Sequence, residues 1–497
     1  MLLSMFACAV HTVPHEPAVP TAAERLALDR SLVAEVQTLN RFAPQTDRNL
    51  GHPWSDDLPL LEAEFSAAAT RPELLRALGH LGNSLHNDHS GFRPAGPNAW
   101  AEIDARLGVH WNDGRPTWFV VRAGPDAGGA QAGDRLVEAD GVPAERLVER
   151  HGFESSGNSW RGIASDVAYW LTVRDTRMPV PETTSWVLER DGERVNASLR
   201  WRSSGYVQRT IEESFAENTC GALREIDYGP YRLVTPGVGY CLYAATEAPF
   251  DAFPIVRQHT YLYSAFGSGM VPALRADQAS MRTALAALPR ARGVILDLRE
   301  NTGGNSPGWF MDWWAPVPYP ALVHRRLLAP SLSDEQRLAR VGVAGEDAVT
   351  YLAGLAAGQP WIESRFGCRP GACDEEGRIV PRHPVTTLPV AVLVGPHCVS
   401  ACDSVSRYFM ENDFAPLVGE PTSAAYAGGD LKLAVLAPDG SELGVLALAA
   451  SYHVSGHGGD DIEGVPLTLD RPVDRTLENY ARYDRLLVET AMEALAH

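Results

Sequence analysis

Ser400 stands where a short apolar strand is expected to turn into a helix. The run Leu388–Val394 is rich in β-branched residues and is broken by Gly395-Pro396, which predicts a buried strand ending in a turn. A helix is expected directly afterwards, over SACDSVSRYFMEN. A serine on such a turn exposes its hydroxyl beside unpaired N–H groups at the positive end of the helix dipole, and these suit a developing oxyanion. The turn therefore predicts either acyl transfer or simple capping of the helix by Ser400.

A polar loop early in the chain carries groups that can exchange protons. The sequence NSLHNDHSGFRP follows a predicted helix and contains two histidines and an aspartate. Because histidine titrates near pH 6.5, such a loop can supply a general base at neutral pH. An alternative is a zinc shell drawn from both ends of the chain, formed by His86, Asp88 and His89 together with His453 and His457, which lie near Glu463 in the sequence. The spacing of the first two histidines fits no strong zinc motif, which disfavours the metal interpretation.

The elements that must position these groups begin with helices. Thr21 and Glu24 form a capping-box pattern ahead of leucines and a valine at helical spacing, which predicts a helix up to Asn40. A second box, Thr70 with Glu73, precedes another helical leucine pattern. We therefore expect residues 21–100 to form a helical subdomain that ends in the polar loop.

From residue 101 to 204 the sequence changes to short strands and glycine turns. The block Ala132-Gly133-Asp134, followed by Leu136-Val137 and Asp140-Gly141, resembles the AGD signature of PDZ domains. A closing strand pair is expected to turn at Asp191-Gly192. PDZ domains bind an extended chain terminus as an added strand. The resemblance places the loop that holds the terminal carboxylate of the substrate at Arg106, Leu107, Gly108 and Val109, and a long helix is expected between Ser155 and Arg177.

The remaining residues, 205–497, alternate strands with helices, which predicts a layered α/β core. The apolar strand Gly293–Leu298 runs into a polar glycine turn, ARGVILDLRENTGG. A hairpin is expected in LKLAVLAPDGSELGVLALAA, with its turn at Asp439-Gly440. Residues 316–383 look long and irregular and are interpreted as an insertion into this core.

Four blocks in this core, taken in order, resemble the tail-specific or C-terminal-processing serine protease family. They are LDLR-x-N-x-GG at 296–304, the Ser400–Asp403 elbow, GE-x-T at 419–422, and the closing IEGVPLTLDRPV. The resemblance covers most of the chain and implies a crotonase-like (ClpP-type) α/β core accompanied by a PDZ domain. It further implies a serine peptidase that acts on protein or peptide substrates and needs no cofactor or metal.

The resemblance also assigns roles to individual residues. Ser400 becomes the nucleophile, and the oxyanion hole falls to the N–H groups of Ala401 and of Gly303 or Gly304. A serine hydroxyl needs a positioned base. The tricorn-like branch of the family takes a histidine from the early loop, which is His89 here, and the closing block supplies Glu463 as its carboxylate partner. This chain departs from that branch in having Asp88, instead of a small residue, before the histidine.

Other features limit the mechanism. Lys432 is the only lysine in the chain and is expected on the solvent-facing side of a strand, which disfavours the Ser-Lys dyad of the other family branch. Cys398 and Cys402 flank Ser400, and a disulfide involving either would stiffen or distort the elbow. A non-enzymatic alternative also remains, because the retinoid-binding repeats of interphotoreceptor retinoid-binding protein share this core. Trp309, Trp313 and Trp314 fit a substrate subsite or, more simply, an aromatic core.

Composition and charge limit which binding partners and which cellular compartment are expected. The net charge of −19 argues against nucleic-acid and anionic-membrane partners. No internal stretch is apolar enough to span a bilayer. Residues 1–20 are interpreted as a signal segment or a disordered start, and Cys8 is a candidate for a lipid anchor. Cys368 and Cys373, close together among seven cysteines, suggest disulfides and an extracytoplasmic location, periplasmic or secreted.

Overall fold

The N-terminal part of the chain is helical, as predicted. The computed structural model describes residues 19–40, 47, 51–97, 99–112, 115–207, 220, 226–304, 307–366, 368, 372–428, 431–459 and 461–496. Its first helices are α1 (Ala22–Leu39), α3 (Leu58–Ala67) and α4 (Arg71–Asn83), and both expected capping boxes are present. The expectation of a signal segment and of a lipid anchor at Cys8 lies outside the described residues.

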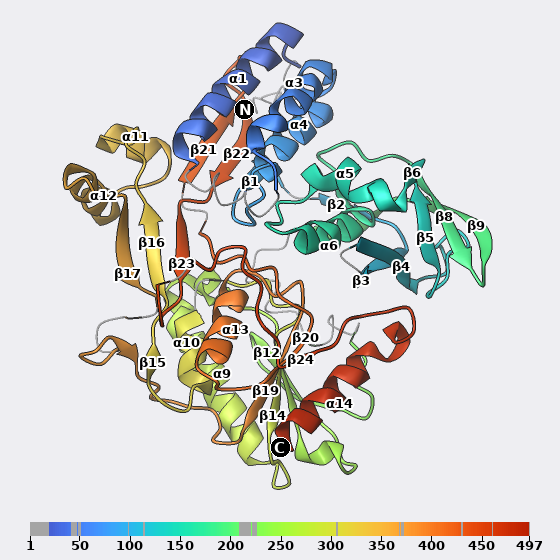
Figure 1. The fold of residues 1–497 in the computed structure, drawn as a ribbon, viewed down its shortest axis with the longest axis vertical. Coiled ribbons are helices and arrows are strands. Elements are labelled where there is room, and N and C mark those ends of the chain that lie inside the picture. Colours follow the sequence, from blue (N-terminus) through green and yellow to red (C-terminus); the bar gives the residue numbers. More distant parts are fainter. Residues whose placement is uncertain are drawn as a thin grey trace, which may run out of the picture.

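A hairpin from the far end of the chain packs against these helices. The hairpin consists of β21 (Leu431–Leu436) and β22 (Glu442–Leu448), and β22 pairs with β1 (Gly91–Pro94) in antiparallel register. Figure 1 shows the two orange strands beside the blue helices. Their apolar faces share one hydrophobic core with α1, α3 and α4. The helical part is therefore not confined to residues 21–100, because the hairpin expected in the α/β core belongs to its packing.

The described residues of the segment 316–383 form regular helices and strands, contrary to the expectation of an irregular insertion. It contains β16 (Val323–Leu327), α11 (Glu335–Arg340), α12 (Glu346–Ala356) and β17 (Trp361–Arg365). Strand β16 pairs on one side with β17 and on the other with β23 (Ser451–Val454). The error has a physical cause: these strands carry many arginines and are only partly buried, so they lack the apolar alternation that marks a strand in sequence.

The β-rich domain, residues 99–207, contains the predicted strand pair with its Asp191-Gly192 turn. Its main sheet has the order β3-β4-β5-β8-β9, with β3 at one edge and the pair β8 and β9 at the other. The bounds are β3 (Ala105–Asn112), β4 (Arg115–Ala123), β5 (Arg135–Ala139), β8 (Thr183–Arg190) and β9 (Glu193–Arg200). A smaller sheet joins β2 (Ala99–Glu102) to β7 (Val173–Asp175) and β10 (Arg202–Val207). The helix expected between Ser155 and Arg177 is shorter than that span, since α6 covers Trp160–Trp170.

The α/β core is built on a seven-stranded sheet of order β11-β12-β13-β14-β19-β20-β24. The strands from β13 to β24 are parallel. Their bounds are β11 (Arg232–Pro236), β12 (Tyr240–Ala244), β13 (Ile255–Gln258), β14 (Val294–Asp297), β19 (Val390–Val394), β20 (Leu417–Gly419) and β24 (Arg471–Pro472). The mixed α/β class predicted from the alternation of strands and helices is confirmed.

Helices cover both faces of this sheet. Helix α14 (Tyr483–Leu495) packs on one face, against Ala391 and Leu393. On the other face, Val392 and Val394 pack with α9 (Met270–Ala286), α10 (Pro307–Trp314) and α13 (Ala401–Glu411). Figure 1 shows these three helices on the side of the sheet opposite α14. Burial on both faces explains why β19 reads as an unbroken apolar run. Trp313 and Trp314 are buried in this core, which favours the structural interpretation of the tryptophans over a subsite.

Six cysteines form three disulfides within the described residues. The pairs are Cys220–Cys241, Cys368–Cys373 and Cys398–Cys402. The last pair spans the predicted elbow and has Ser400 at its centre. Among the residues that the structure describes, no helix combines the length and the apolar character needed to cross a membrane.

Candidate active site

The turn that carries Ser400 has the geometry of a nucleophile elbow. Strand β19 ends at Val394, and α13 begins at Ala401, so Ser400 occupies the junction that leads into the helix. Its backbone has φ 62° and ψ −116°, a left-handed region that non-glycine residues rarely adopt. Such a conformation costs about 1–3 kcal/mol and persists only where neighbouring groups enforce it. The sharp bend leaves the Ser400 hydroxyl at the N-terminal end of α13.

His89 reaches this hydroxyl from the other end of the chain. Its Nε2 atom lies 2.8 Å from Ser400 Oγ, which is hydrogen-bond distance, across 311 residues of sequence. The loop that carries His89 begins at the end of α4 and is held by Asn87, whose Oδ1 accepts the His89 backbone N–H at 3.1 Å. Ser90 fastens the loop to the hairpin, because its Oγ accepts the Ala449 N–H at 3.0 Å. The loop therefore presents the imidazole in a fixed place.

Glu463 is buried behind this loop and is held by three donors. Its Oε2 accepts the Tyr426 N–H at 2.7 Å, and its Oε1 accepts the Asn158 side-chain amide at 3.1 Å. The amide of Asn87 also approaches Oε1, at 3.4 Å, so Asn87 links Glu463 to the backbone of His89. Burial raises the pKa of Glu463 to about 8, although the bonds from Asn158 and Tyr426 act in the opposite direction.

Asp403, in the first turn of α13, braces the elbow. Its carboxylate accepts the backbone N–H of Ser400 at 2.9 Å and those of Ala424 and Ala425 at 3.0 and 3.1 Å. The hydroxyl of Ser423 donates to it at 2.9 Å. Burial raises the pKa of Asp403 to about 6, against these hydrogen bonds. The aspartate that follows Ser400 in the family motif therefore ties the elbow to the segment after GE-x-T.

Asp88 is the charged neighbour of His89 and is also buried. Burial and the nearby carboxylates of Asp166, Glu463 and Asp403 raise the pKa of Asp88 well above its usual value. Asp166 has a raised pKa as well, chiefly because it is buried. The raised pKa favours the uncharged form of Asp88, which limits the negative charge in this buried region.

The backbone of the glycine turn lies against the elbow, as the family resemblance implies. A Cβ on Gly303 would lie 2.9 Å from Ser400 Cβ and 3.0 Å from Ala401 N, so only glycine fits there. The Gly303 N–H donates to Asn301 Oδ1 at 2.9 Å and is therefore engaged inside the turn. Ala401 occupies the first helical position, where an N–H has no intrahelical acceptor. Of the expected oxyanion donors, Ala401 therefore fits this arrangement better than Gly303.

The segment expected to hold a chain terminus is a strand and not a loop. Arg106, Leu107, Gly108 and Val109 all lie within β3, paired with β4. Arg106 is already engaged, because its guanidinium binds the Ile103 and Ala105 carbonyls and the Glu102 carboxylate. The AGD block resembles that of a PDZ domain, but the strand begins earlier than the resemblance implies. The prediction of a carboxylate-holding loop at Arg106 is therefore wrong for this residue.

The other three residues of that segment line a cleft between the β-rich domain and the core. Leu107, Gly108 and Val109 form one wall, together with residues of α6. The opposite wall includes Pro396 and His397 of the turn that leads to Ser400. The cleft thus connects the edge strand β3 with the approach to the elbow.

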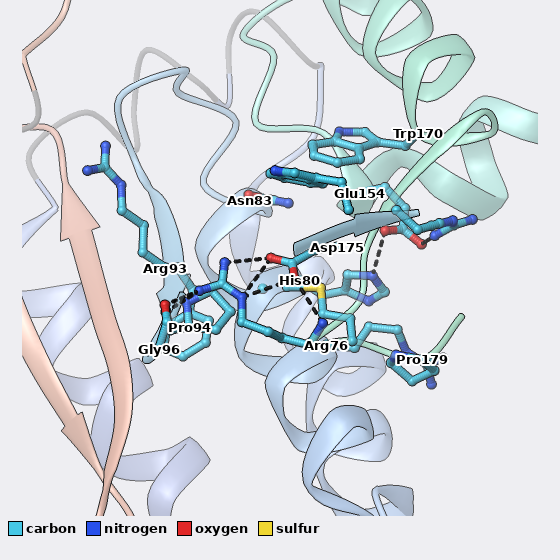
Figure 2. A pocket seen from close by; sticks show the side chains of 16 residues that line it. Arg76, His80, Asn83, Arg93, Pro94, Gly96, Glu154, Trp170, Asp175 and Pro179 are labelled. Carbon is cyan, nitrogen blue, oxygen red and sulfur yellow. Dashed lines mark hydrogen bonds and ion pairs between the residues drawn. The ribbon is translucent and has the colours of Figure 1, made fainter. Parts of the chain in front are cut away.

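A second cavity, of about 500 Å³, lies between α4 and the β-rich domain (Figure 2). Ser400, His89 and Glu463 do not line it. Arg177 binds both oxygens of Asp175, and Glu154 lies 2.8 Å from Arg174 and 3.7 Å from His80. Burial opposes protonation of this histidine, but the carboxylates on either side raise the pKa of His80 to about 9. The walls of this cavity are thus held together by ion pairs. Because these ion pairs hold α4, they also hold the start of the loop that carries His89.

The remaining candidates from the sequence have other contacts. Lys432 is exposed on β21, as expected. His453 contacts Ser404 at 3.1 Å, and burial lowers its pKa well below the usual value. Within the described part of the chain, no group of three or more histidine, cysteine or acidic side chains is placed to hold a metal ion.

Sequence reasoning missed three residues that hold the candidate site residues Ser400, His89 and Glu463 in place. Asn87 is two positions before His89, and a polar neighbour in a functional loop was a usable signal. Asp403 belonged to the elbow motif but was given no role. Asn158 carried no signal, because it lies in the β-rich domain, 305 positions from the Glu463 that it binds.

The fold and the Ser400 elbow define an α/β serine peptidase. Residues 263–473 match the model of peptidase family S41, so the chain carries a domain of this family and is a serine peptidase of that class. No curated protein sequence matches the chain significantly.

The whole chain is similar to solved structures of CPAF. Mature CPAF complexed with lactacystin is 15% identical, with a TM-score of 0.67 over 96% of this chain and 99% of that one. Mature CPAF alone is 16% identical, with a TM-score of 0.68 over 95% of this chain and 96% of that one. At this identity the likeness concerns the fold, and it extends well beyond the family S41 domain.

Proposed function

We propose that this chain hydrolyses peptide bonds through an acyl-enzyme on Ser400, with His89 as the general base. The observation that carries the proposal is the 2.8 Å contact between His89 Nε2 and Ser400 Oγ. A serine hydroxyl becomes nucleophilic only when a positioned base takes its proton. Family membership supports the reaction class, and the contact supports the assignment of the base.

The geometry supports the following sequence of proton transfers. His89 takes the Ser400 proton while Oγ attacks the carbonyl carbon of the substrate. The N–H groups of Ala401 and Gly304 are proposed to donate to the developing oxyanion, and the α13 dipole favours its negative charge. His89 then gives the proton to the leaving amine, and water attacks the acyl-enzyme with His89 again as base.

Glu463 is proposed as the carboxylate that stabilises the charged form of His89. Asn87 connects the two residues, since it binds Glu463 through its amide and the His89 backbone through its oxygen. Only the ionised carboxylate can stabilise an imidazolium. Because the pKa of Glu463 is raised to about 8, we expect the highest activity in mildly alkaline solution.

The β-rich domain is proposed to act as a PDZ domain that engages the substrate chain. Strand β3 lies at the edge of its sheet, and α6 packs beside β3, so a peptide can add to that edge as a further strand. Leu107, Gly108 and Val109 line the cleft that continues to His397. A substrate chain held there would run toward the elbow.

The proposed site of action is outside the cytoplasm, either periplasmic or secreted. Three disulfides are formed, and such bonds persist mainly in oxidising compartments. The lipid anchor at Cys8 remains a prediction from sequence.

The function is tested by peptide hydrolysis with the purified full-length chain. We expect hydrolysis of an unfolded protein substrate by the wild type, and a fall of at least about a hundredfold in Ser400→Ala and in His89→Ala. His383→Ala, which changes an exposed histidine, is the matched control and should be unaffected. Undiminished hydrolysis by both active-site variants would refute the assignment. A wild type that binds peptides without cleaving them would favour the non-enzymatic alternative.

A further inference from the structure

The disulfide between Cys398 and Cys402 closes a covalent ring around the proposed nucleophile. The ring contains Cys398, Val399, Ser400, Ala401 and Cys402, so the nucleophile is its middle residue. Both cysteine side chains are fully buried. One end of the bond lies in the turn after β19, and the other lies in the first turn of α13.

The sulfur atoms also contact the elements that support the elbow. Cys402 Sγ lies 3.4 Å from the carbonyl oxygen of Leu298, directly after β14, where the turn toward Gly303 begins. Cys398 Sγ lies 3.5 Å from Ser406 Oγ, one turn further along α13. The bond therefore packs between the elbow, the helix and the start of the glycine turn.

The backbone just before Ser400 is held by two hydrogen bonds to neighbouring segments. The Cys398 carbonyl accepts the Ser423 N–H at 3.4 Å, and the Val399 N–H donates to the Asn301 carbonyl at 3.2 Å. Directly after these two anchors, Ser400 must keep its left-handed backbone and hold Oγ within reach of His89. The next residue, Ala401, must at the same time present its N–H to the oxyanion. A cross-link between positions 398 and 402 restricts the backbone over the stretch in which both demands must be met.

We propose that Cys398 and Cys402 are positioning residues for Ser400, and that their disulfide makes peptide hydrolysis depend on oxidation of this pair. The inference rests on the proposed function. A dithiol reductant breaks the S–S bond by thiol–disulfide exchange: it supplies two electrons and two protons, leaves two cysteine thiols, and is itself converted to a disulfide. The freed turn can then relax away from the geometry that Ser400 needs, and a displacement of about 1 Å is enough to cost about a hundredfold in rate.

The other two disulfides provide matched controls within the same chain. Cys220–Cys241 includes a residue of β12, and Cys368–Cys373 lies in the segment between β17 and β18 (Arg378–Ile379). Neither ring contains a residue proposed to act in catalysis. Their removal tests whether any loss of a disulfide lowers activity, for example through stability alone.

The experiment compares double variants of the full-length chain. Cys398→Ala/Cys402→Ala is measured beside Cys220→Ala/Cys241→Ala and Cys368→Ala/Cys373→Ala, and active sites are counted by titration with a fluorophosphonate. We expect kcat per titrated site to fall at least tenfold in the first variant, with KM within twofold of wild type, and to change less than twofold in the others. Dithiothreitol should lower kcat of the wild type similarly, reversibly on reoxidation, and should not affect the first variant.

The outcomes separate this inference from the proposed function. Equal kcat per titrated site in all three variants would overturn the positioning role, even if the first variant melts at a lower temperature. If that variant does not fold, wild type reduced at positions 398 and 402, as verified by alkylation and mass spectrometry, decides the question by the same criterion. Oxidised wild type that neither cleaves peptide nor labels at Ser400 would refute the proposed function itself.

Discussion

Replacing Glu463 by glutamine should raise stability at alkaline pH while it lowers activity. The folded protein holds a proton on Glu463 up to about pH 8, whereas an unfolded glutamate loses it near the reference pKa of 4.5. The folded state therefore binds the proton more tightly, and the stability of the wild type falls as pH rises through this window. At about 1.36 kcal/mol per pKa unit, the full cost of ionising Glu463 is on the order of 5 kcal/mol above pH 8. Glutamine does not titrate and carries no such cost.

Urea unfolding followed by tryptophan fluorescence measures this difference. We expect the free energy of unfolding of Glu463→Gln to be close to that of the wild type at pH 4.5. It should then exceed the wild-type value by an amount that grows up to pH 9, toward about 5 kcal/mol. This difference in stability is an upper limit, because denatured chains retain some structure. Peptide hydrolysis at pH 9 should fall at least about a hundredfold in the same variant, because a neutral amide cannot stabilise an imidazolium.

The activity of the wild type gives the second half of this test. With a pKa of about 8 for Glu463, roughly a tenth of the molecules carry the carboxylate at pH 7, so kcat/KM should rise about tenfold by pH 9. Asp29→Asn is the matched control, because burial raises the pKa of Asp29 to about 6 in α1, remote in sequence from the site. It should alter the pH dependence of stability and leave kcat/KM unchanged. A stability gain in Glu463→Gln that is the same at pH 4.5 and pH 9 would refute the reasoning.

Three further variants probe the surroundings of the site. Asn158→Ala removes a hydrogen bond that lowers the pKa of Glu463, so the alkaline rise of kcat/KM should move to higher pH. The control Asn412→Ala should leave the pH profile of kcat/KM unchanged. Identical pH profiles for the two variants would contradict the role of Asn158. Lys432→Ala should retain kcat/KM within twofold, and a loss of a hundredfold would revive the Ser-Lys dyad. Val109→Arg, in the cleft wall, should raise KM for protein substrates with kcat unchanged; an unaltered KM would count against a substrate role for the β3 edge.

Local signals predicted the elements that carry the site. The capping boxes at Thr21 and Thr70 start helices where expected, and the apolar run before Gly395 is a central strand. These signals need only neighbouring residues, because caps, turns and periodicity are set within a few positions of the chain. The order of four short motifs then led to the family, and the family model covers the core that contains Ser400.

Long-range packing was not visible in the sequence. The pairing of β22 with β1 joins residues more than three hundred positions apart, and nothing in the hairpin itself reveals which subdomain will bury its apolar face. The bond from Asn158 to Glu463 likewise depends on how the β-rich domain sits against the core. The strand at Arg106 was mistaken for a loop because its pairing with β4, and not its composition, defines it.

The reactivity of Ser400 toward a fluorophosphonate, located by mass spectrometry, tests the relay between His89 and Ser400 without any knowledge of the natural substrate. Wild type should be labelled at Ser400, and His89→Ala should be labelled at least about a hundredfold more slowly. Labelling of His89→Ala at the wild-type rate, or of a serine other than Ser400, would show that the imidazole 2.8 Å from this hydroxyl does not activate it.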